Sequence, residues 1–93
     1  MDLLDALKIN LGITSSAYDA RLGELIEAAK AFINREGVTA LNTDNIEDSE
    51  LVIMYAAYLW RRRDSAEGMP RMLRWALNNR IFSAKMQVVT AGD

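Results

Sequence analysis

The side chains that could carry out chemistry in this chain are carboxylates and guanidinium groups. The 93 residues include 13 acids and 11 lysines and arginines, but no histidine and no cysteine. Without histidine the commonest general base and metal ligand is missing, and without cysteine there is no thiol nucleophile and no disulfide. Zinc sites, Ser-His-Asp triads and Cys-His pairs are therefore excluded by composition. We expect no metal and no cofactor.

Paired carboxylates could act as a general acid and a general base. The candidates are Glu24 with Glu27, and the acidic stretch Asp44–Glu50. Both fall on faces that we expect to be exposed, where nothing would shift their pKa values. The acidic stretch also lacks the central glycine of a calcium loop, and it suits the positively polarised start of a helix. We therefore expect no enzymatic activity.

The charges are divided unevenly along the chain. Residues 1–60 hold ten acids against four bases, whereas residues 61–85 hold seven bases against two acids. Such a chain can bind a copy of itself head to tail. The simpler interpretation is two ordinary solvated faces.

The arginines also admit a nucleic-acid interpretation. Arg61–Arg63 lead through a short turn into a helix that bears Arg71 and Arg74. A helix-turn-helix places its second helix in the major groove, so a small DNA-binding regulator would present these two side chains to bases. The net charge of −2 argues against this function, because dedicated DNA readers are usually basic.

The element that must position these groups is the apolar stretch Leu51–Trp60. Its ten consecutive apolar residues are too few to span a membrane, which takes about 20, so we expect no membrane insertion. Alanine, leucine and methionine favour a helix here. A helix that is apolar on every side must be covered on every side, either by the other helices or by another subunit.

Three further helices are predicted around this central one. Leucines on one stripe predict a helix over Asp2–Leu11, and a seven-residue apolar face from Tyr18 to Ile33 predicts a second over Ala17–Glu36. Gly12 and Gly37 are placed to end them, and Ser16 with Asp19 has the spacing of a capping box. The last helix starts at Pro70, and we expect its apolar face to comprise Met69, Met72, Leu73, Ala76 and Leu77.

The end of the chain is predicted to leave the helical domain. Asn78–Asn79 is a plausible helix stop, because asparagine tolerates the left-handed conformation. Ile81–Val89 is apolar, partly β-branched and without a helical period. The sequence thus predicts a mainly α, four-helix domain over residues 1–80, built around a central apolar helix. Residues 81–93 are predicted to form an extended C-terminal arm or strand.

Four stretches of this chain resemble a known family. They are LDALKINLGI (4–13), YDARLGELIEAAKAFI (18–33), VIMYAAYLWRRR (52–63) and MPRMLRWALNNRIF (69–82). Together they are similar to the small head–tail connector proteins of tailed bacteriophages and prophages, also called adaptor or head-completion proteins. The most specific features are the Met-Pro-Arg opening, the Leu-Arg-Trp and the Asn-Asn before an apolar segment. These are packing and interface motifs without a catalytic signature.

The resemblance implies a structural subunit of the virion. Such a subunit assembles as a homo-oligomeric ring under the portal protein at the head–tail junction, after synthesis in the bacterial host cytoplasm. The ring extends the DNA channel and provides a docking platform for the head-closure (stopper) or tail protein. Genomic DNA would pass through it without sequence-specific binding.

For the contacts with other subunits or the portal we expect mostly arginine and aromatic side chains, which are enriched among binding hot spots. The candidates are Arg61, Arg62, Arg63, Arg71, Arg74, Trp75, Ile81, Phe82 and Met86. The alternative is that Trp75 packs over the core and the arginines only solvate helix ends. From the sign of their charge, Glu24 and Glu27 are candidates for the channel lining, where they would repel DNA.

Overall fold

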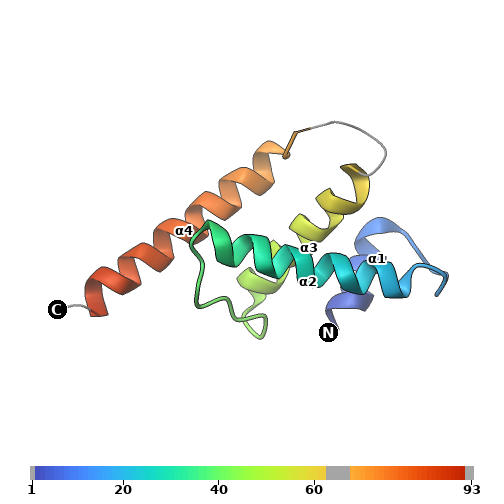
Figure 1. Cartoon of the computed structure of the whole chain (residues 1–93), viewed down its shortest axis with the longest axis horizontal. Coiled ribbons are helices and arrows are strands. Elements are labelled where there is room, and N and C mark those ends of the chain that lie inside the picture. Colours follow the sequence, from blue (N-terminus) through green and yellow to red (C-terminus); the bar gives the residue numbers. More distant parts are fainter. Residues whose placement is uncertain (1, 63–67, 92–93) are drawn as a thin grey trace.

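The chain folds into four α-helices. The computed structural model describes residues 2–62 and 68–91, with side chains up to residue 86. These residues form α1 (Leu3–Leu11), α2 (Asp19–Glu36), α3 (Ile46–Arg61) and α4 (Arg71–Ala91), and they contain no strand. Figure 1 shows α4 passing the C-terminal end of α2 and extending beyond the other helices at its own C-terminal end. The prediction of a mainly α, four-helix domain is confirmed.

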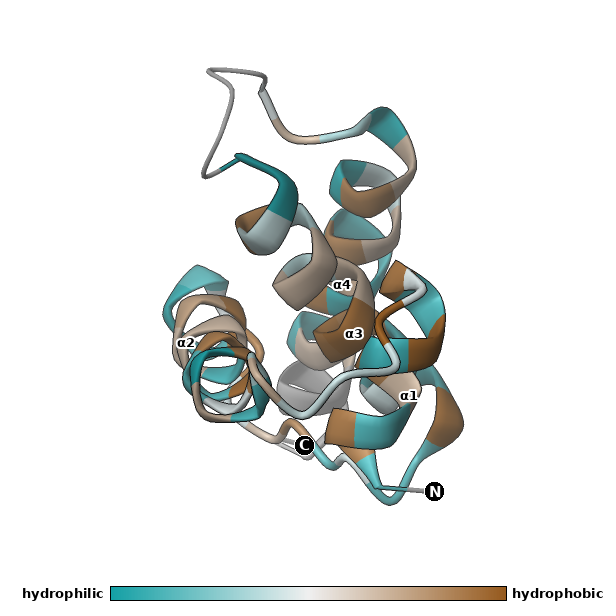
Figure 2. Cartoon of the chain, turned by 90° about the vertical axis from the view of Figure 1, so that its right-hand side faces the viewer, coloured by the Kyte–Doolittle hydropathy of each residue, from teal (hydrophilic) through white to brown (hydrophobic). Residues whose placement is uncertain are grey.

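Helix α3 is the centre of the packing. It packs along α2 and against α1, and α4 makes its contacts chiefly with α3; Figure 2 shows α3 between α2 and α1. Its buried residues are Asp48, Leu51, Val52, Ile53, Tyr55, Ala56 and Ala57. The predicted central apolar helix is therefore confirmed. Among the described residues, no helix is long and apolar enough to cross a membrane.

Helix α2 buries the apolar face that its sequence predicts. Leu22, Leu25, Ile26, Ala29 and Ile33 are all buried, in agreement with their spacing of three and four residues. The helix begins at residue 19, two residues later than predicted, and its N-cap has no side-chain hydrogen bond.

The capping box predicted at the start of α2 is wrong. The Asp19 carboxylate instead forms an ion pair with Lys8 of α1, with Nζ 2.8 Å from Oδ1. The contact joins the first two helices at the turn between them.

Both predicted glycine stops are confirmed. Gly12 adopts φ 72° and donates its backbone N–H to the carbonyl of Ile9, and Ile13 donates to Lys8. Gly37 adopts φ 128° and donates to Asn34, and Val38 donates to Ile33. A side chain with a Cβ is strained at such positive φ values, so these positions require glycine to end α1 and α2.

The predicted extended arm is wrong, because α4 continues to Ala91. The helical period runs through the asparagine pair: Leu73, Leu77 and Ala84 are buried on one side of the helix. Asn78 and Asn79 lie on the exposed side, where each costs only about 0.6 kcal/mol of helix propensity. The helix therefore crosses the proposed boundary at residues 80 and 81. The last two residues of the predicted arm, 92–93, lie outside the described residues.

Candidate assembly surfaces

A buried ion pair holds the middle of α4 against the start of α3. Arg80 donates from Nε to Asp48 Oδ1 at 2.6 Å and from Nη2 to Oδ2 at 3.2 Å. The same Nη2 reaches the carbonyl of Ala40 at 3.3 Å, and the Asn42 backbone N–H donates to Asp48 Oδ2 at 2.9 Å. The side chains of Asp48 and Arg80 are only 4% and 15% exposed. We call this group of contacts the Asp48–Arg80 clamp.

The environment of Asp48 favours its ionised form. Burial alone would raise the pKa of this carboxyl group, but the hydrogen bonds from Arg80 and Asn42 and the charge of Arg80 more than offset that effect. The pKa of Asp48 therefore lies below its ordinary value of 3.8. The prediction that nothing would shift the pKa values of the acidic stretch is wrong for this residue.

The outward side of α4 carries large apolar side chains. Met72, Trp75, Phe82 and Met86 are between 51% and 73% exposed, although Met72 was expected in the core. We call these four residues the outward stripe. Because Leu73 and Leu77 occupy the opposite side, α4 is apolar both toward the core and toward solvent. A surface of this kind commonly marks a protein–protein contact.

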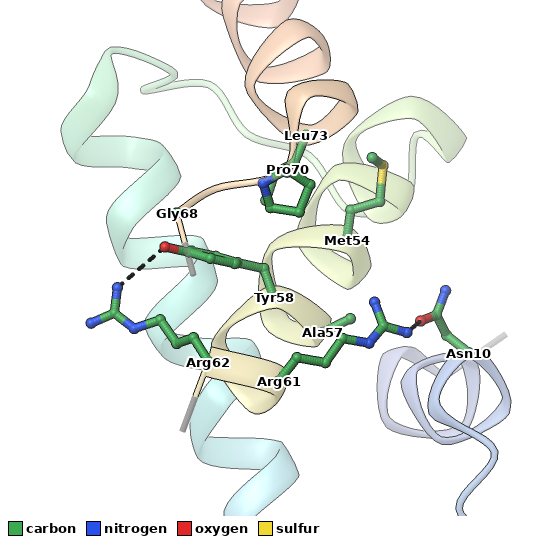
Figure 3. A pocket seen from close by; sticks show the side chains of 9 residues that line it. All are labelled: Asn10, Met54, Ala57, Tyr58, Arg61, Arg62, Gly68, Pro70 and Leu73. Carbon is green, nitrogen blue, oxygen red and sulfur yellow. Dashed lines mark hydrogen bonds between the residues drawn. The ribbon is translucent and has the colours of Figure 1, made fainter. Parts of the chain in front are cut away.

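The two described arginines at the end of α3 make local contacts at the helix end. Arg61 Nη2 lies 3.5 Å from Asn10 Oδ1, and Arg62 Nη1 lies 3.4 Å from the Tyr58 hydroxyl. Figure 3 shows both arginines at the edge of a small depression with Pro70 opposite. Its volume is about 170 Å³. Both guanidinium groups are exposed and remain accessible to a partner.

The other candidate contact residues have different environments. Arg71 is exposed, and Arg74 Nη1 lies 3.9 Å from Glu36 Oε2, a distance typical of a weak surface pair. Ile81 is partly buried against the core and therefore offers a partner less surface than Phe82. Arg63 lies outside the described residues.

A groove separates α3 from α4 on the side of Trp75. Its volume is about 440 Å³. Trp75, Ala76 and Ser83 line it from α4, and Glu47, Glu50 and Met54 line it from α3. The groove thus combines an apolar wall with two carboxylates.

The two candidate channel residues are exposed on α2. Glu24 Oε2 pairs with Arg21 Nη1 at 3.1 Å, and Glu27 Oε2 pairs with Lys30 Nζ at 3.0 Å. These pairs join residues one helical turn apart, so their negative charge is partly balanced within the helix.

The segment between α3 and α4 differs from that of a helix-turn-helix. Helix α3 ends at Arg61 and α4 begins at Arg71, which leaves residues 62–70 as the connection. A helix-turn-helix joins its helices by a turn of about three to four residues. The spacing therefore gives no support to the DNA-reading arrangement of Arg71 and Arg74.

The structure is that of a small α-helical domain whose last helix exposes large apolar side chains. A family model described as "Phage gp6-like head-tail connector protein" matches residues 1–80. The chain belongs to this family of phage structural proteins, as its sequence motifs indicated. No curated protein and no solved structure matches the chain.

The sequence alone did not predict the clamp between Asp48 and Arg80 or the exposure of Met72 in the outward stripe. Asp48 resembles its acidic neighbours, and Arg80 resembles the other arginines of the basic segment. Only the three-dimensional structure pairs them, because they are 32 positions apart. Met72 could have been found from its spacing of three residues from Trp75, which places both on one side of a helix.

Proposed function

We propose that this phage or prophage protein forms a ring of identical subunits beneath the portal protein at the head–tail junction. The ring extends the channel for genomic DNA and provides the surface on which the head-closure (stopper) or tail protein docks. The subunit is made in the host cytoplasm and ends in the virion. Its role is geometric, and it needs neither catalysis nor a cofactor.

The observation that carries the proposal is the outward stripe of α4. A small domain with a complete core on the inner side of this helix still exposes Trp75 and Phe82 on its outer side. Tryptophan is enriched among the residues that contribute most to binding energy. Membership in a connector family makes another phage protein or another copy the natural partner of this surface.

The basic residues supply the rim of the proposed contacts. Arg61, Arg62 and Arg71 are exposed at the end of α3 and the start of α4. Arg63 and Arg74 are the other two arginines that the sequence predicts as contact residues. Exposed charges at the rim of an interface act mainly on association rate and on orientation. We assign these arginines to contacts with a neighbouring subunit or with the portal.

The channel lining is assigned to the outer face of α2. Glu24 and Glu27 would repel DNA phosphates and keep the genome sliding. Their pairing with Arg21 and Lys30 weakens this repulsion. A ring structure with both glutamates on its outer wall would overturn the assignment.

Electron microscopy of the purified chain, alone and mixed with its portal protein, tests the proposed function. We expect closed rings, or an additional density layer on the portal. A chain that forms no ring and leaves the portal unchanged would contradict the proposal.

Duplex binding provides a separate test against the regulator hypothesis. We expect no sequence preference, and any binding through the arginines should fall steeply as salt rises. A tight complex with one particular duplex that withstands high salt would favour a transcriptional regulator instead.

A further inference from the structure

The outward stripe of α4 has the spacing of a helix–helix seam. Met72, Trp75, Asn79, Phe82 and Met86 follow one another at steps of three, four, three and four residues. This is the heptad pattern by which one helix packs along another, and a polar residue within such a seam specifies register. Asn79 holds that central position and is exposed. The stripe is therefore built to lie along an elongated apolar surface.

The charged side chains beside this seam are basic, so they favour a partner surface that carries carboxylates. From Gly68 to Gly92 the sequence contains four bases and no acid. Arg80 is occupied by Asp48 in the clamp, whereas Arg71 and Lys85 are exposed along one edge of the stripe. Two α4 helices packed on each other would offer these cations no carboxylate. Charges at the edges of a seam select the partner, so self-pairing of α4 is disfavoured.

An acidic, apolar surface of matching length lies along α3. Four adjoining depressions follow this helix: Glu50 lines three of them, and Asn10 and Met54 each line two. Ile46 lines one of these depressions and Ile9 lines another. Their side chains are 77% and 70% exposed. We call this surface the α3 trough.

The acids of the α3 trough gather at one end. Asp44, Glu47 and Glu50 line it near the start of α3, and Arg61 and Arg62 line it near the end. The 16 residues of α3 give the trough a length of about 24 Å. That length accommodates the described part of the stripe, from residue 72 to residue 86, which extends over about 21 Å.

We propose that the outward stripe of α4 in one copy packs into the α3 trough of the next copy. Lys85, with Phe82 beside it, would meet the carboxylates near the start of α3 together with Ile46 and Ile9. Trp75 and Asn79 also line the groove beside α3 in their own chain, but Met72, Phe82 and Met86 line none of the four depressions. The two surfaces are therefore different, and the contact is heterologous and repeats around a closed ring or along a filament. The inference rests on the proposed ring and specifies which surfaces form it.

Two double variants of the chain test the two sides of this contact one at a time. The trough variant carries Ile46→Ser and Glu50→Lys, and the stripe variant carries Phe82→Ser and Lys85→Glu. All four side chains are exposed, so both variants should keep the helical circular dichroism and melting temperature of the wild type. The matched control is Arg35→Glu, a charge reversal at an exposed position of α2 that belongs to neither surface.

Sedimentation of each protein, alone and mixed, provides the measurement. We expect each variant alone to associate at least about tenfold more weakly than the wild type, as expected for loss of an apolar anchor and a charge pair. An equimolar mixture should form 1:1 dimers and nothing larger, because only one stripe and one trough remain intact between the two proteins. The control should associate like the wild type.

The outcomes separate this inference from the proposed function. If the trough variant assembles as well as the wild type, α4 binds another surface and the inference is wrong, although the ring proposal stands. A wild-type chain that remains monomeric by itself would also overturn direct stripe-to-trough packing. The ring proposal would then be decided by microscopy of the complex with the portal protein.

Discussion

Helices α3 and α4 are both apolar on more than one side, but the chain covers α3 far more completely than α4. Ala56 and Ala57 of α3 are buried by the surrounding helices. On α4, Leu77 is buried whereas Trp75, two positions earlier, is exposed. The difference shows that apolar surface serves two purposes in this small domain. On α3 most of it forms the core, and on the outward side of α4 it is left for another molecule.

The largest effect is expected from a charge placed in the α3 core. Ala57 is 1% exposed, so Ala57→Asp buries an unpaired carboxylate at a cost of several kcal/mol, comparable to the stability of a small domain. We expect the helical circular dichroism to be lost at room temperature. Ala31→Asp on the exposed side of α2 is the control and should remain folded. A folded Ala57→Asp variant would mean that α3 is not the core helix.

The two sides of α4 should respond differently to truncation. Leu77→Ala leaves a cavity in the core and should lower the free energy of unfolding by about 2–5 kcal/mol. Trp75→Ala should change it by less than about 1 kcal/mol, since its side chain is mostly exposed, and should weaken assembly by about 2 kcal/mol per contact. Thermal unfolding and sedimentation measure the two effects. Loss of both fold and assembly in Trp75→Ala would place Trp75 in the core.

A smaller and pH-dependent effect is expected from the clamp. Asp48→Asn keeps the shape of the side chain but removes its charge, which should cost about 2 kcal/mol at neutral pH. Because the pKa of Asp48 is lowered by folding, its stabilisation is present above the ordinary value of 3.8 and is lost as pH falls through the folded pKa.

The pH dependence of unfolding measures this contribution. We expect the difference in melting temperature between wild type and Asp48→Asn to be greatest near neutral pH and to shrink below about pH 4. A difference that stays constant with pH would show that the Asp48 charge does not stabilise the fold.

The smallest effect is expected on the outer face of α2. Replacing Glu24 and Glu27 by glutamine removes two surface ion pairs, each worth about 0.2–0.5 kcal/mol. Melting temperature should change by only a few degrees. If these residues line the channel, DNA ejection from assembled particles should slow while ring formation is unchanged. Unchanged ejection would place them away from DNA.

The sequence predicted the helices whose apolar residues repeat at a constant spacing. In α2, Leu22, Leu25, Ile26 and Ala29 lie on one side at spacings that only a helix satisfies. The ten-residue apolar run of α3 was equally informative, because so small a domain has few places to bury it. Local physical preferences therefore determined these elements and their ends at Gly12 and Gly37.

Contacts between distant residues account for what the sequence did not predict. Asn78–Asn79 and the β-branched residues near the end of α4 disfavour a helix locally, but the packing of Leu77 and Ala84 on one side keeps the backbone helical. The exposure of Met72 also depends on which side of α4 faces α3. Buried Leu73 and Leu77 and the Asp48–Arg80 clamp lie on that side, and the sequence does not show that Asp48 and Arg80 form a pair.

The clamp also attaches α4 to the rest of the subunit. It ties α4 to Ala40 and Asp48, and Asn42 in turn holds Asp48, whereas α1, α2 and α3 pack on one another through their own contacts. We therefore expect α4 to detach as a unit while the other three helices remain folded, a form of local unfolding that amide hydrogen exchange detects. The protected amides of α4 should exchange before those of α2 and α3, and Asp48→Asn should speed exchange in α4 alone. The helix that would make the contact with the next copy is thus also the one that we expect to leave its own domain first.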